Sequence, residues 1–525
     1  MAVELYNTLG GMIESHAQAY HDKIALEFEG RKVTYLDINH QANKIANAIT
    51  QNGIKNGDHV SYLGKNSIFY FCLLLGCSKI GVIVTPINWR LAPPEISYIL
   101  NDCSAKALFV GHEYTGIISD LKPELKTCET YISYETLVEG FSNLAGWLEG
   151  QATENPESRI EPEDVFVQLY TSGTTGHPKG VMITHKNIVQ TKQLIEAENI
   201  DWYSWTETDV SLNGMPFFHI GGTAWGLSGL MAGARSIITR EFVPSEVLGY
   251  IEEFQISKIF LVPAAMQMVV NHPRAREVNY DSIRYMLYGA SPIPLDLLRT
   301  CMDVFGCGFV QLYGMTETSG TIVALPPEDH DPNGNKRMRS AGRALPGVEV
   351  GIMSEDGKLL PPGQIGQIVT RSSANMKGYW NLDAASRETL INDGWLCTGD
   401  AGEIDSDGYV YILDRVKDMI ISGGENVYPA EVENALFSHA GVADAGVIGV
   451  PDKKWGEAVK ACIVLKENSD VSESELIAFA KTQIAGYKCP KSIDFVTVLP
   501  RNPSGKILRR ELRKPYWDKY QRAVN

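Results

Sequence analysis

Short apolar runs rich in β-branched residues alternate with segments of helical pattern over most of the chain. The clearest strand candidates are residues 107–110, 236–239, 258–262 and 284–288, and residues 263–271 have a helical pattern. Such alternation is typical of parallel sheets whose faces are covered by helices. Because 525 residues are too many for one small core, two or more domains are expected. We therefore predict the α/β class, with a large N-terminal domain of parallel or mixed sheets and helices.

The pattern changes twice toward the C-terminus. From about residue 348, shorter strands and turns follow one another, at 348–352, 355–357 and 366–370, as in an antiparallel sheet or a small barrel. A charged cluster at 414–418 then separates a strand at 409–413 from further helices and strands. These changes predict a small barrel-like subdomain, a domain boundary near 414–418, and a small α+β domain at the C-terminus.

The composition limits the kinds of partner. Hydrophobic residues make up 44% of the chain and charged residues 21%, as in an ordinary globular protein. The 47 basic and 63 acidic residues give a net charge of −16, which disfavours nucleic acid or an anionic membrane surface as the main partner. Anionic small ligands remain open, because a local basic pocket can lie in an acidic protein.

The cysteines and the apolar segments favour a cytoplasmic protein. None of the nine cysteines forms a Cys-x-x-Cys pair, so we expect mostly buried, reduced thiols rather than a disulfide framework. Residues 1–16 lack the pattern of a signal peptide. The most hydrophobic stretch, 68–75, is too short to span a bilayer and predicts a core helix followed by a buried strand.

A glycine-rich loop lies at residues 170–180, where the sequence is Tyr-Thr-Ser-Gly-Thr-Thr-Gly-His-Pro-Lys-Gly. Glycines let backbone N–H groups approach an anion closely, and the hydroxyls and Lys179 add further donors, which favours phosphate binding. It is not a Walker A loop, because Lys179 follows Pro178 and no Ser or Thr comes next. The alternative is a flexible surface loop, which such composition also indicates.

Four further motifs carry related chemistry. The run 311–317 offers Tyr313 and Gly314 for stacking against a base and Glu317 for a metal ion. Asp400 ends the run 395–400 and can accept hydrogen bonds from ribose hydroxyls. The cluster 414–418 leads into the run 421–426, and Lys506 lies in a Pro/Gly-rich loop at 500–506. Taken singly, these motifs are also typical of a helix start, a turn or a solvated linker.

Together, in this order and spacing, the five motifs resemble those of the adenylate-forming superfamily of acyl-CoA synthetases, peptide-synthetase adenylation domains and firefly luciferase. The resemblance extends from the N-terminal region to Lys506. It implies an N-terminal adenylation domain at 1–414, a hinge at 415–418 and a mobile C-terminal domain at 419–525. It also implies two half-reactions: a carboxylate attacks the α-phosphate of ATP, with Mg²⁺ bound, and a thiol, usually that of coenzyme A, then displaces AMP.

The resemblance implies a role for each motif residue. Lys506 would bridge the carboxylate and the α-phosphate, Glu317 would hold magnesium, and Thr316 would contact phosphate. Rotation about Lys417 would exchange Lys506 for Gly423 and Gly424, which would then line the tunnel for the thiol. The residues implied to bind the nucleotide are Thr171, Ser172, Gly173, Thr174, Thr175, Gly176, Lys179, Gly289, Ala290, Ser291, Gln311, Tyr313, Gly314, Asp400 and Arg415.

The resemblance also implies an acyl pocket beside His219, which matches a gate between that pocket and the thiol tunnel; the alternative is a core histidine. The pocket residues implied are Gly221, Gly222, Thr223, Met266, Tyr288, Leu312 and Met315. Because none is an Asp, Lys or Arg, an amino-acid substrate is disfavoured. The two glycines and the apolar lining favour a medium- or long-chain fatty acid, whereas Tyr288 also suits a cinnamate or benzoate derivative.

Three classes of function fit these residues. The first, which we favour, is an acyl-CoA synthetase with a carboxylic acid, ATP and coenzyme A as its small-molecule partners. The second is a stand-alone adenylation enzyme that loads a carrier protein. The third is an inactive ligand-binding relative, which the presence of both Lys506 and Glu317 disfavours. The sequence leaves open whether the protein is a homodimer.

Overall fold

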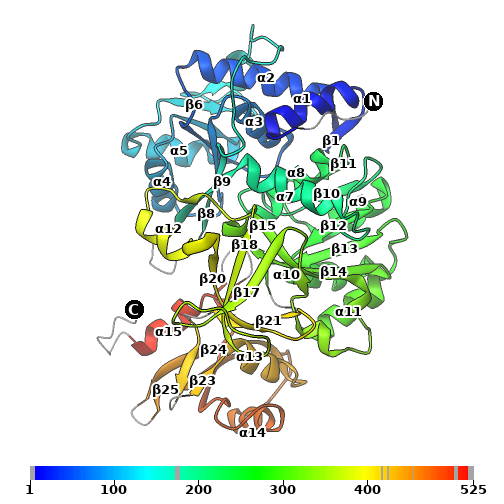
Figure 1. The fold of residues 1–525 in the computed structure, drawn as a ribbon, viewed down its shortest axis with the longest axis vertical. Coiled ribbons are helices and arrows are strands. Elements are labelled where there is room, and N and C mark those ends of the chain that lie inside the picture. The colour runs from blue at the N-terminus through cyan, green and yellow to red at the C-terminus, as the bar shows by residue number, and fades with distance from the viewer. Residues whose placement is uncertain are drawn as a thin grey trace.

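The computed structural model describes residues 6–171, 178–291, 293–415, 418–422, 425–452, 455–501 and 506–517. Figure 1 shows a large N-terminal part, coloured blue to green, above a smaller C-terminal part in orange and red. Strands β17, β18, β20 and β21 lie between the two. The described helices are α1 (Leu9–Ala19), α2 (Tyr35–Gln51), α3 (Ile68–Ser78), α4 (Pro93–Asp102), α5 (Thr115–Leu121), α6 (Leu144–Trp147), α7 (His185–Ala197), α8 (Ile220–Met231), α9 (Pro244–Phe254), α10 (Pro263–Val270), α11 (Leu295–Phe305), α12 (Asp383–Thr389), α13 (Pro429–Phe437), α14 (Glu473–Gln483) and α15 (Arg509–Trp517).

The N-terminal part contains two mixed sheets. The strands of one follow the order β19-β9-β8-β4-β3-β5-β6-β7 and those of the other the order β16-β15-β14-β13-β12-β10-β11-β1-β2. The first comprises β3 (His59–Leu63), β4 (Ile83–Ile87), β5 (Ala107–Val110), β6 (Thr130–Ser133), β7 (Ser142–Asn143), β8 (Val165–Thr171), β9 (Lys179–Thr184) and β19 (Gly378–Tyr379). The second comprises β1 (Ile24–Phe28), β2 (Arg31–Thr34), β10 (Val210–Asn213), β11 (Arg235–Ile238), β12 (Lys258–Leu261), β13 (Tyr285–Gly289), β14 (Gly308–Met315), β15 (Gly320–Leu325) and β16 (Arg343–Ala344). Pairing is parallel through the middle of both sheets. It is antiparallel at both edges of the second sheet and at the β19-β9-β8 edge of the first, whose other edge, β6-β7, is parallel. The predicted α/β fold is confirmed.

The predicted antiparallel segment is also confirmed. Strands β17 (Val348–Met353), β18 (Gly366–Ser372), β20 (Leu396–Ile404) and β21 (Val410–Arg415) pair in that order, each antiparallel to the next. Beyond them, β22 (Ile420–Ser422), β23 (Glu425–Val427), β24 (Val442–Asp452), β25 (Gly456–Leu465) and β26 (Ser492–Phe495) form a separate sheet. The buried core packed on that sheet draws its residues from 420–493, so the C-terminal part has a hydrophobic core of its own.

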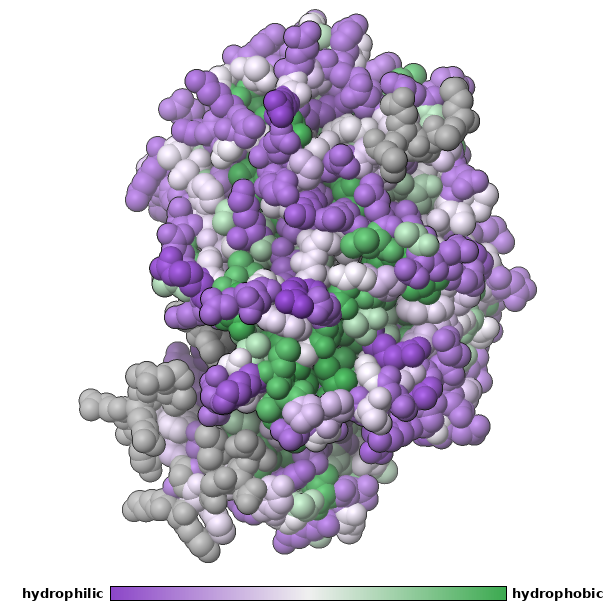
Figure 2. Space-filling view, viewed as in Figure 1, coloured by the Kyte–Doolittle hydropathy of each residue, from purple (hydrophilic) through white to green (hydrophobic). Residues whose placement is uncertain are grey.

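The burial of the apolar segments follows the sequence pattern. Helix α3 is buried along nearly its whole length and is followed by the fully buried strand β4, as the run at 68–75 predicts. All nine cysteines lie in described ranges as free thiols, and only Cys307 and Cys397 are not buried. Within the described ranges, no helix is both long and apolar enough to cross a membrane. Hydrophilic residues cover most of the face in Figure 2, with an apolar area near its middle, above the C-terminal part.

Candidate active site

The adjacent parallel strands β13 and β14 bring two of the sequence motifs together. Gly289, at the end of β13, lies opposite Leu312 of β14. A Cβ on Gly289 would lie 2.1 Å from the carbonyl oxygen of Leu312, so the position accepts only glycine. Ala290 follows in the left-handed region, with φ of +67°. Ligands of open α/β sheets bind at the carboxyl ends of the strands, and here the segments 289–291 and 313–314 share that edge.

Tyr313 connects this edge to the strands β20 and β21. Its hydroxyl donates to Oδ2 of the buried Asp400 at 2.7 Å. Asp400 in turn lies in register with Arg415 across β20 and β21, so the two residues predicted to hold the ribose are neighbours in the sheet. Gln311 lies two residues before Tyr313 on β14, where its side-chain oxygen accepts a hydrogen bond from the Tyr288 hydroxyl at 3.3 Å. An aromatic ring, a carboxylate and a strand edge therefore adjoin one another, as a nucleoside requires.

A second cluster joins Lys179 to Glu317. The glycine-rich motif connects β8 and β9, with Thr171 in register with Lys179. The Lys179 ammonium lies 4.8 Å from the centre of the Tyr379 ring, and the Tyr379 hydroxyl donates to Oε1 of the buried Glu317 at 2.9 Å. Half-buried Thr316 precedes Glu317 in the same 3₁₀ turn. Tyr379 belongs to no motif that sequence reasoning identified, and only the pairing of β19 with β9 places it here.

The residues around Glu317 fit a magnesium ion that arrives with a nucleotide. Mg²⁺ prefers oxygen ligands and is usually held by one or two carboxylates together with substrate phosphates. Glu317 supplies such a carboxylate beside the loop predicted to bind phosphate. Among the described residues, no group of three or more His, Cys, Asp or Glu side chains could enclose a metal ion without a ligand. The donor set therefore suits a metal–nucleotide complex rather than a resident metal.

His219 is partly buried directly before α8. Its ring centre is 4.5 Å from that of Phe218, and its Nε2 is buried without a hydrogen-bond partner among the described residues. Burial, together with the positive charges of Arg90 and Lys506, lowers the pKa of His219 to about 4. His219 is therefore neutral near pH 7, and Lys506 of the C-terminal part lies near enough for its charge to act on it.

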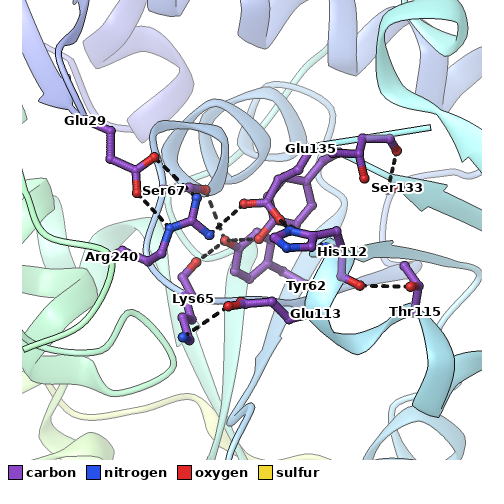
Figure 3. Close-up of polar contacts among 12 residues, drawn as sticks. Glu29, Tyr62, Lys65, Ser67, His112, Glu113, Thr115, Ser133, Glu135 and Arg240 are labelled. Carbon is purple, nitrogen blue, oxygen red and sulfur yellow. Dashed lines mark hydrogen bonds and ion pairs between the residues drawn. The ribbon is translucent and has the colours of Figure 1, made fainter. Parts of the chain in front are cut away.

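A polar network behind His219 fixes the segment that precedes it. Asn66 accepts a hydrogen bond from the Phe217 N–H at 3.0 Å and donates to the Met215 carbonyl at 3.1 Å. The neighbouring Lys65 pairs with Glu113 at 3.1 Å, and Arg240 pairs with both Glu29 and Glu135 (Figure 3). The loop after β3 is therefore held by the ion pairs of Lys65 with Glu113 and Glu241, and its Asn66 holds residues 215–217.

A cavity of about 120 Å³ adjoins these residues. It lies between α7 and α8 and beside the segment 318–321, which follows Glu317 directly. Of the predicted pocket residues, Gly221 and Leu312 line it. Gly222 instead packs on backbone, because a Cβ there would lie 2.2 Å from the Pro216 carbonyl oxygen. Thr223, Met266 and Tyr288 are fully buried, and Met315 is partly buried; none of these four is among the lining residues.

The same cavity has charged lining that the sequence-based pocket lacked. Lys192 and Glu196, both on α7, face into it. The sequence-based expectation of an uncharged pocket rested on the seven pocket residues named above, and none of those residues lies on α7. Several motif residues lie outside the described ranges, namely Ser172, Gly173, Thr174, Thr175, Gly176, Lys417, Gly423 and Gly424, together with the side chain of Arg415. Ser291 is partly exposed at the strand edge described above.

Comparisons with known proteins agree with this geometry. The family profile "AMP-binding enzyme" matches residues 13–380, and the profile "AMP-binding enzyme C-terminal domain" matches residues 431–506. The chain is 40% identical over 511 residues to fatty acid–[acyl-carrier-protein] ligase ScoC of Streptomyces coeruleorubidus, covering 97% of this chain and 96% of that protein. It is 36% identical over 495 residues to a feruloyl-CoA synthase of an Amycolatopsis species, covering 94% and 96%.

Among solved structures, ATP-bound MatB of Rhodopseudomonas palustris superposes with a TM-score of 0.88 at 28% identity, covering 98% of this chain and all of that one. The apo form of MatB, at the same identity and coverage, gives 0.78. The two family profiles, the relatives and the clustering of the motifs lead to one assignment. The chain belongs to the AMP-binding enzymes of the adenylate-forming superfamily, in the acyl-CoA synthetase branch, and is an AMP-forming acid–thiol ligase.

Proposed function

We propose that this enzyme activates a medium-length or single-ring carboxylic acid as its acyl-adenylate and transfers the acyl group to coenzyme A. In the first half-reaction a carboxylate oxygen attacks the α-phosphorus of ATP, and the bond from that phosphorus to the pyrophosphate oxygen breaks. In the second, the thiol sulfur attacks the acyl carbon, the bond to AMP breaks, and the thiol proton passes to a base or to water. The observation that carries the proposal is that Lys506 lies near enough to His219 for its positive charge to lower the pKa of that histidine, while the cavity is lined by the next residues, Ile220 and Gly221.

Charge explains why the residues of the site are needed. An anion that attacks a polyanion must first have its charge compensated, and fixed cations in a water-poor site do this best. Lys506 is proposed to lie between the carboxylate and the α-phosphate, with residues 171–179 around the outer phosphates. Bound Mg²⁺, held by Glu317, would supply further positive charge. Tyr313 and Asp400, which are hydrogen-bonded to each other, are proposed to hold the adenosine, since a carboxylate accepts from ribose hydroxyls.

The second half-reaction is proposed to follow a rotation of the C-terminal domain, residues 419–525, about a hinge at 415–418. Rotation would remove Lys506 and bring Gly423 and Gly424 to the thiol tunnel behind His219. The better superposition on ATP-bound than on apo MatB supports assigning the present arrangement to the first half-reaction. One pocket can then serve two reactions, because a mobile domain changes the groups that line it.

The identity of the acid and the thiol can be tested in one screen. We expect release of AMP that depends on an acid, ATP and coenzyme A, with octanoate or a cinnamate better than palmitate, because the cavity is small. Consumption of coenzyme A thiol is measured in parallel with loading of a purified acyl carrier protein. If adenylate forms but coenzyme A is not consumed while the carrier protein is loaded, the enzyme loads a carrier, as the name of the Streptomyces relative indicates for that protein.

Asn66 provides a test of the gate assigned to His219. Asn66→Ala removes both hydrogen bonds to residues 215–217, and displacing a positioned group by about 1 Å can cost about a hundredfold in rate. We expect thioester formation to fall at least about tenfold while acid-dependent ATP–pyrophosphate exchange falls less. Asn66→Asp, which keeps the acceptor for the Phe217 N–H, should recover part of the loss. Equal losses in both half-reactions would assign Asn66 a general structural role.

A further inference from the structure

One wall of the cavity is charged, although its lining is largely apolar. Ile220, Phe260 and Leu312 line it, whereas Lys192 and Glu196 lie at the α7 wall together with Trp205. The Lys192 ammonium is 2.6 Å from Glu196 Oε1, one helical turn away; the lysine side chain is 11% exposed and the glutamate side chain 37%. A lysine is rarely buried to this extent unless it is paired. The pair is therefore a polar feature of the wall that a molecule bound in the cavity can contact.

Lys192 has capacity for a further hydrogen bond. An ammonium group has three N–H donors, and among the described residues Glu196 is the one hydrogen-bonding partner of Lys192. Its other neighbour is the Trp205 ring, whose centre is 5.9 Å away. Burial lowers the pKa of Lys192, and the charges of Glu196 and Asp209 partly offset this effect. The cavity thus contains a cation with unused donors and a carboxylate with a second acceptor oxygen.

Other polar groups reinforce this wall of the cavity. Tyr203 and Thr321 also line the cavity, and each carries a hydroxyl group. The buried Lys258 is 5.1 Å from the centre of the Trp205 ring, and the negative charge of Asp209 acts on it. Because the acidic groups balance the basic ones here, the wall presents paired donors and acceptors rather than a net charge.

We propose that the acid activated by this enzyme carries a hydroxyl group at the end opposite its carboxylate, and that this hydroxyl binds between Lys192 and Glu196. This inference rests on the proposed function, because it names the class of acid that the same site activates. A hydroxyl donates one hydrogen bond and accepts others, so it can donate to Glu196 and accept from Lys192. A plain hydrocarbon end would leave the remaining N–H donors of the largely buried Lys192 without partners, which is costly in a cavity. A second carboxylate would be repelled by Glu196.

The size of the cavity limits the rest of the molecule. An apolar cavity of about 150 Å³ binds benzene, so a volume of about 120 Å³ suits roughly one phenyl ring or a hydrocarbon chain of similar size. The predicted substrates are therefore phenolic acids such as 4-hydroxycinnamate, or ω-hydroxy acids of medium length, rather than long saturated fatty acids.

Matched pairs of acids test the inference directly. We would compare 4-hydroxycinnamate with cinnamate, and 8-hydroxyoctanoate with octanoate and octanedioate, by acid-dependent ATP–pyrophosphate exchange. We expect kcat/KM to be at least about tenfold higher for each hydroxylated acid than for its parent, because a site built to bind a hydroxyl disfavours the analogue that lacks it. A wild-type enzyme that activates the parent acids equally well or better would overturn the inference and leave the proposed function intact. A preference for octanedioate would overturn it as well.

Variants on α7 test whether Lys192 causes the expected preference for hydroxylated acids. Lys192→Met should abolish the advantage of the hydroxylated acids, mainly by raising their KM, and should leave kcat/KM for cinnamate and octanoate unchanged or higher. Lys186→Met is the control: it makes the same change on the same helix, at an exposed lysine paired with Glu163. A comparable loss of preference in this control would contradict the assignment.

Removing Lys192 alone leaves Glu196 without its ion pair, which can destabilise the fold. If thermal unfolding shows that Lys192→Met is unfolded, the double variant Lys192→Met/Glu196→Met removes both charges together. This double variant should fold and should give equal kcat/KM for each hydroxylated acid and its parent. A folded double variant that retains the preference would overturn the inference. If no acid in the panel supports exchange with the folded wild type, the proposed function itself fails.

Discussion

Replacement of Lys506 by alanine should nearly abolish adenylation, with a fall of about a thousandfold or more in acid-dependent ATP–pyrophosphate exchange. The reason is electrostatic: loss of one preorganised donor at a developing charge commonly costs about a hundred- to a thousandfold. Here the donor also compensates the repulsion between carboxylate and phosphate. The position of Lys506 near His219 gives this expectation its structural basis.

The second half-reaction separates a catalytic role for Lys506 from a structural one. Thioester formation from the pre-formed adenylate of the best acid should proceed at close to the wild-type rate in Lys506→Ala, because the proposed rotation has by then removed the lysine. Lys481→Ala, at an exposed lysine on α14 of the same domain, serves as the control and should affect neither rate. Equal losses in both half-reactions of Lys506→Ala would contradict the rotation.

Glu317→Gln should lower the exchange rate by about a hundredfold or more and raise the concentration of Mg²⁺ needed for half-maximal activity. The amide retains the size of the side chain but removes the charge that attracts the metal–nucleotide complex. Exchange rates over a series of magnesium concentrations measure both effects. An unchanged magnesium requirement would show that Glu317 only helps to form the 3₁₀ turn at 316–318.

Tyr379→Phe is the matched variant for this prediction. It retains the ring beneath Lys179 but removes the hydroxyl that donates to Glu317 Oε1. We expect a smaller fall, of about tenfold, because one hydrogen bond to a charged group is worth about 1.5–3 kcal/mol at most. A loss as large as that of Glu317→Gln would indicate that Tyr379 itself contacts the nucleotide.

Part of the fold was readable from the sequence because the relevant signals are local. The alternation of apolar strands with helical segments depends on neighbouring residues, and β5, β11, β12 and β13 lie within about a residue of the expected ranges. The antiparallel segment after residue 348 was recognisable from its short strands and turns for the same reason. The strand order was not readable, because pairing joins segments that are distant in sequence, as β1 with β11.

The candidate site likewise contains residues that sequence motifs identify and residues that only the tertiary structure brings into it. The sequence by itself indicated the chemical groups of a nucleotide site and their order, because each motif is a short run whose residue types serve one kind of contact. The hydrogen bond from Tyr313 to Asp400 brings two of these motifs together, and the roles assigned to their residues stay predictions. The sequence did not identify Tyr379, because a single tyrosine outside any motif indicates no function. Only the pairing of β19 with β9 brings it to Glu317.

Only the tertiary structure decided the character of the acyl cavity. In the sequence, Lys192 and Glu196 are an i, i+4 pair of the kind that usually lies on the solvent-exposed face of a helix. Whether such a pair is exposed or buried depends on what packs against the helix, and here it lines the cavity beside Trp205 and α8, with the Lys192 side chain 11% exposed and that of Glu196 37%. Burial turns a common surface pair into a potential recognition element, because the cost of leaving its hydrogen-bonding groups unused rises when water is excluded.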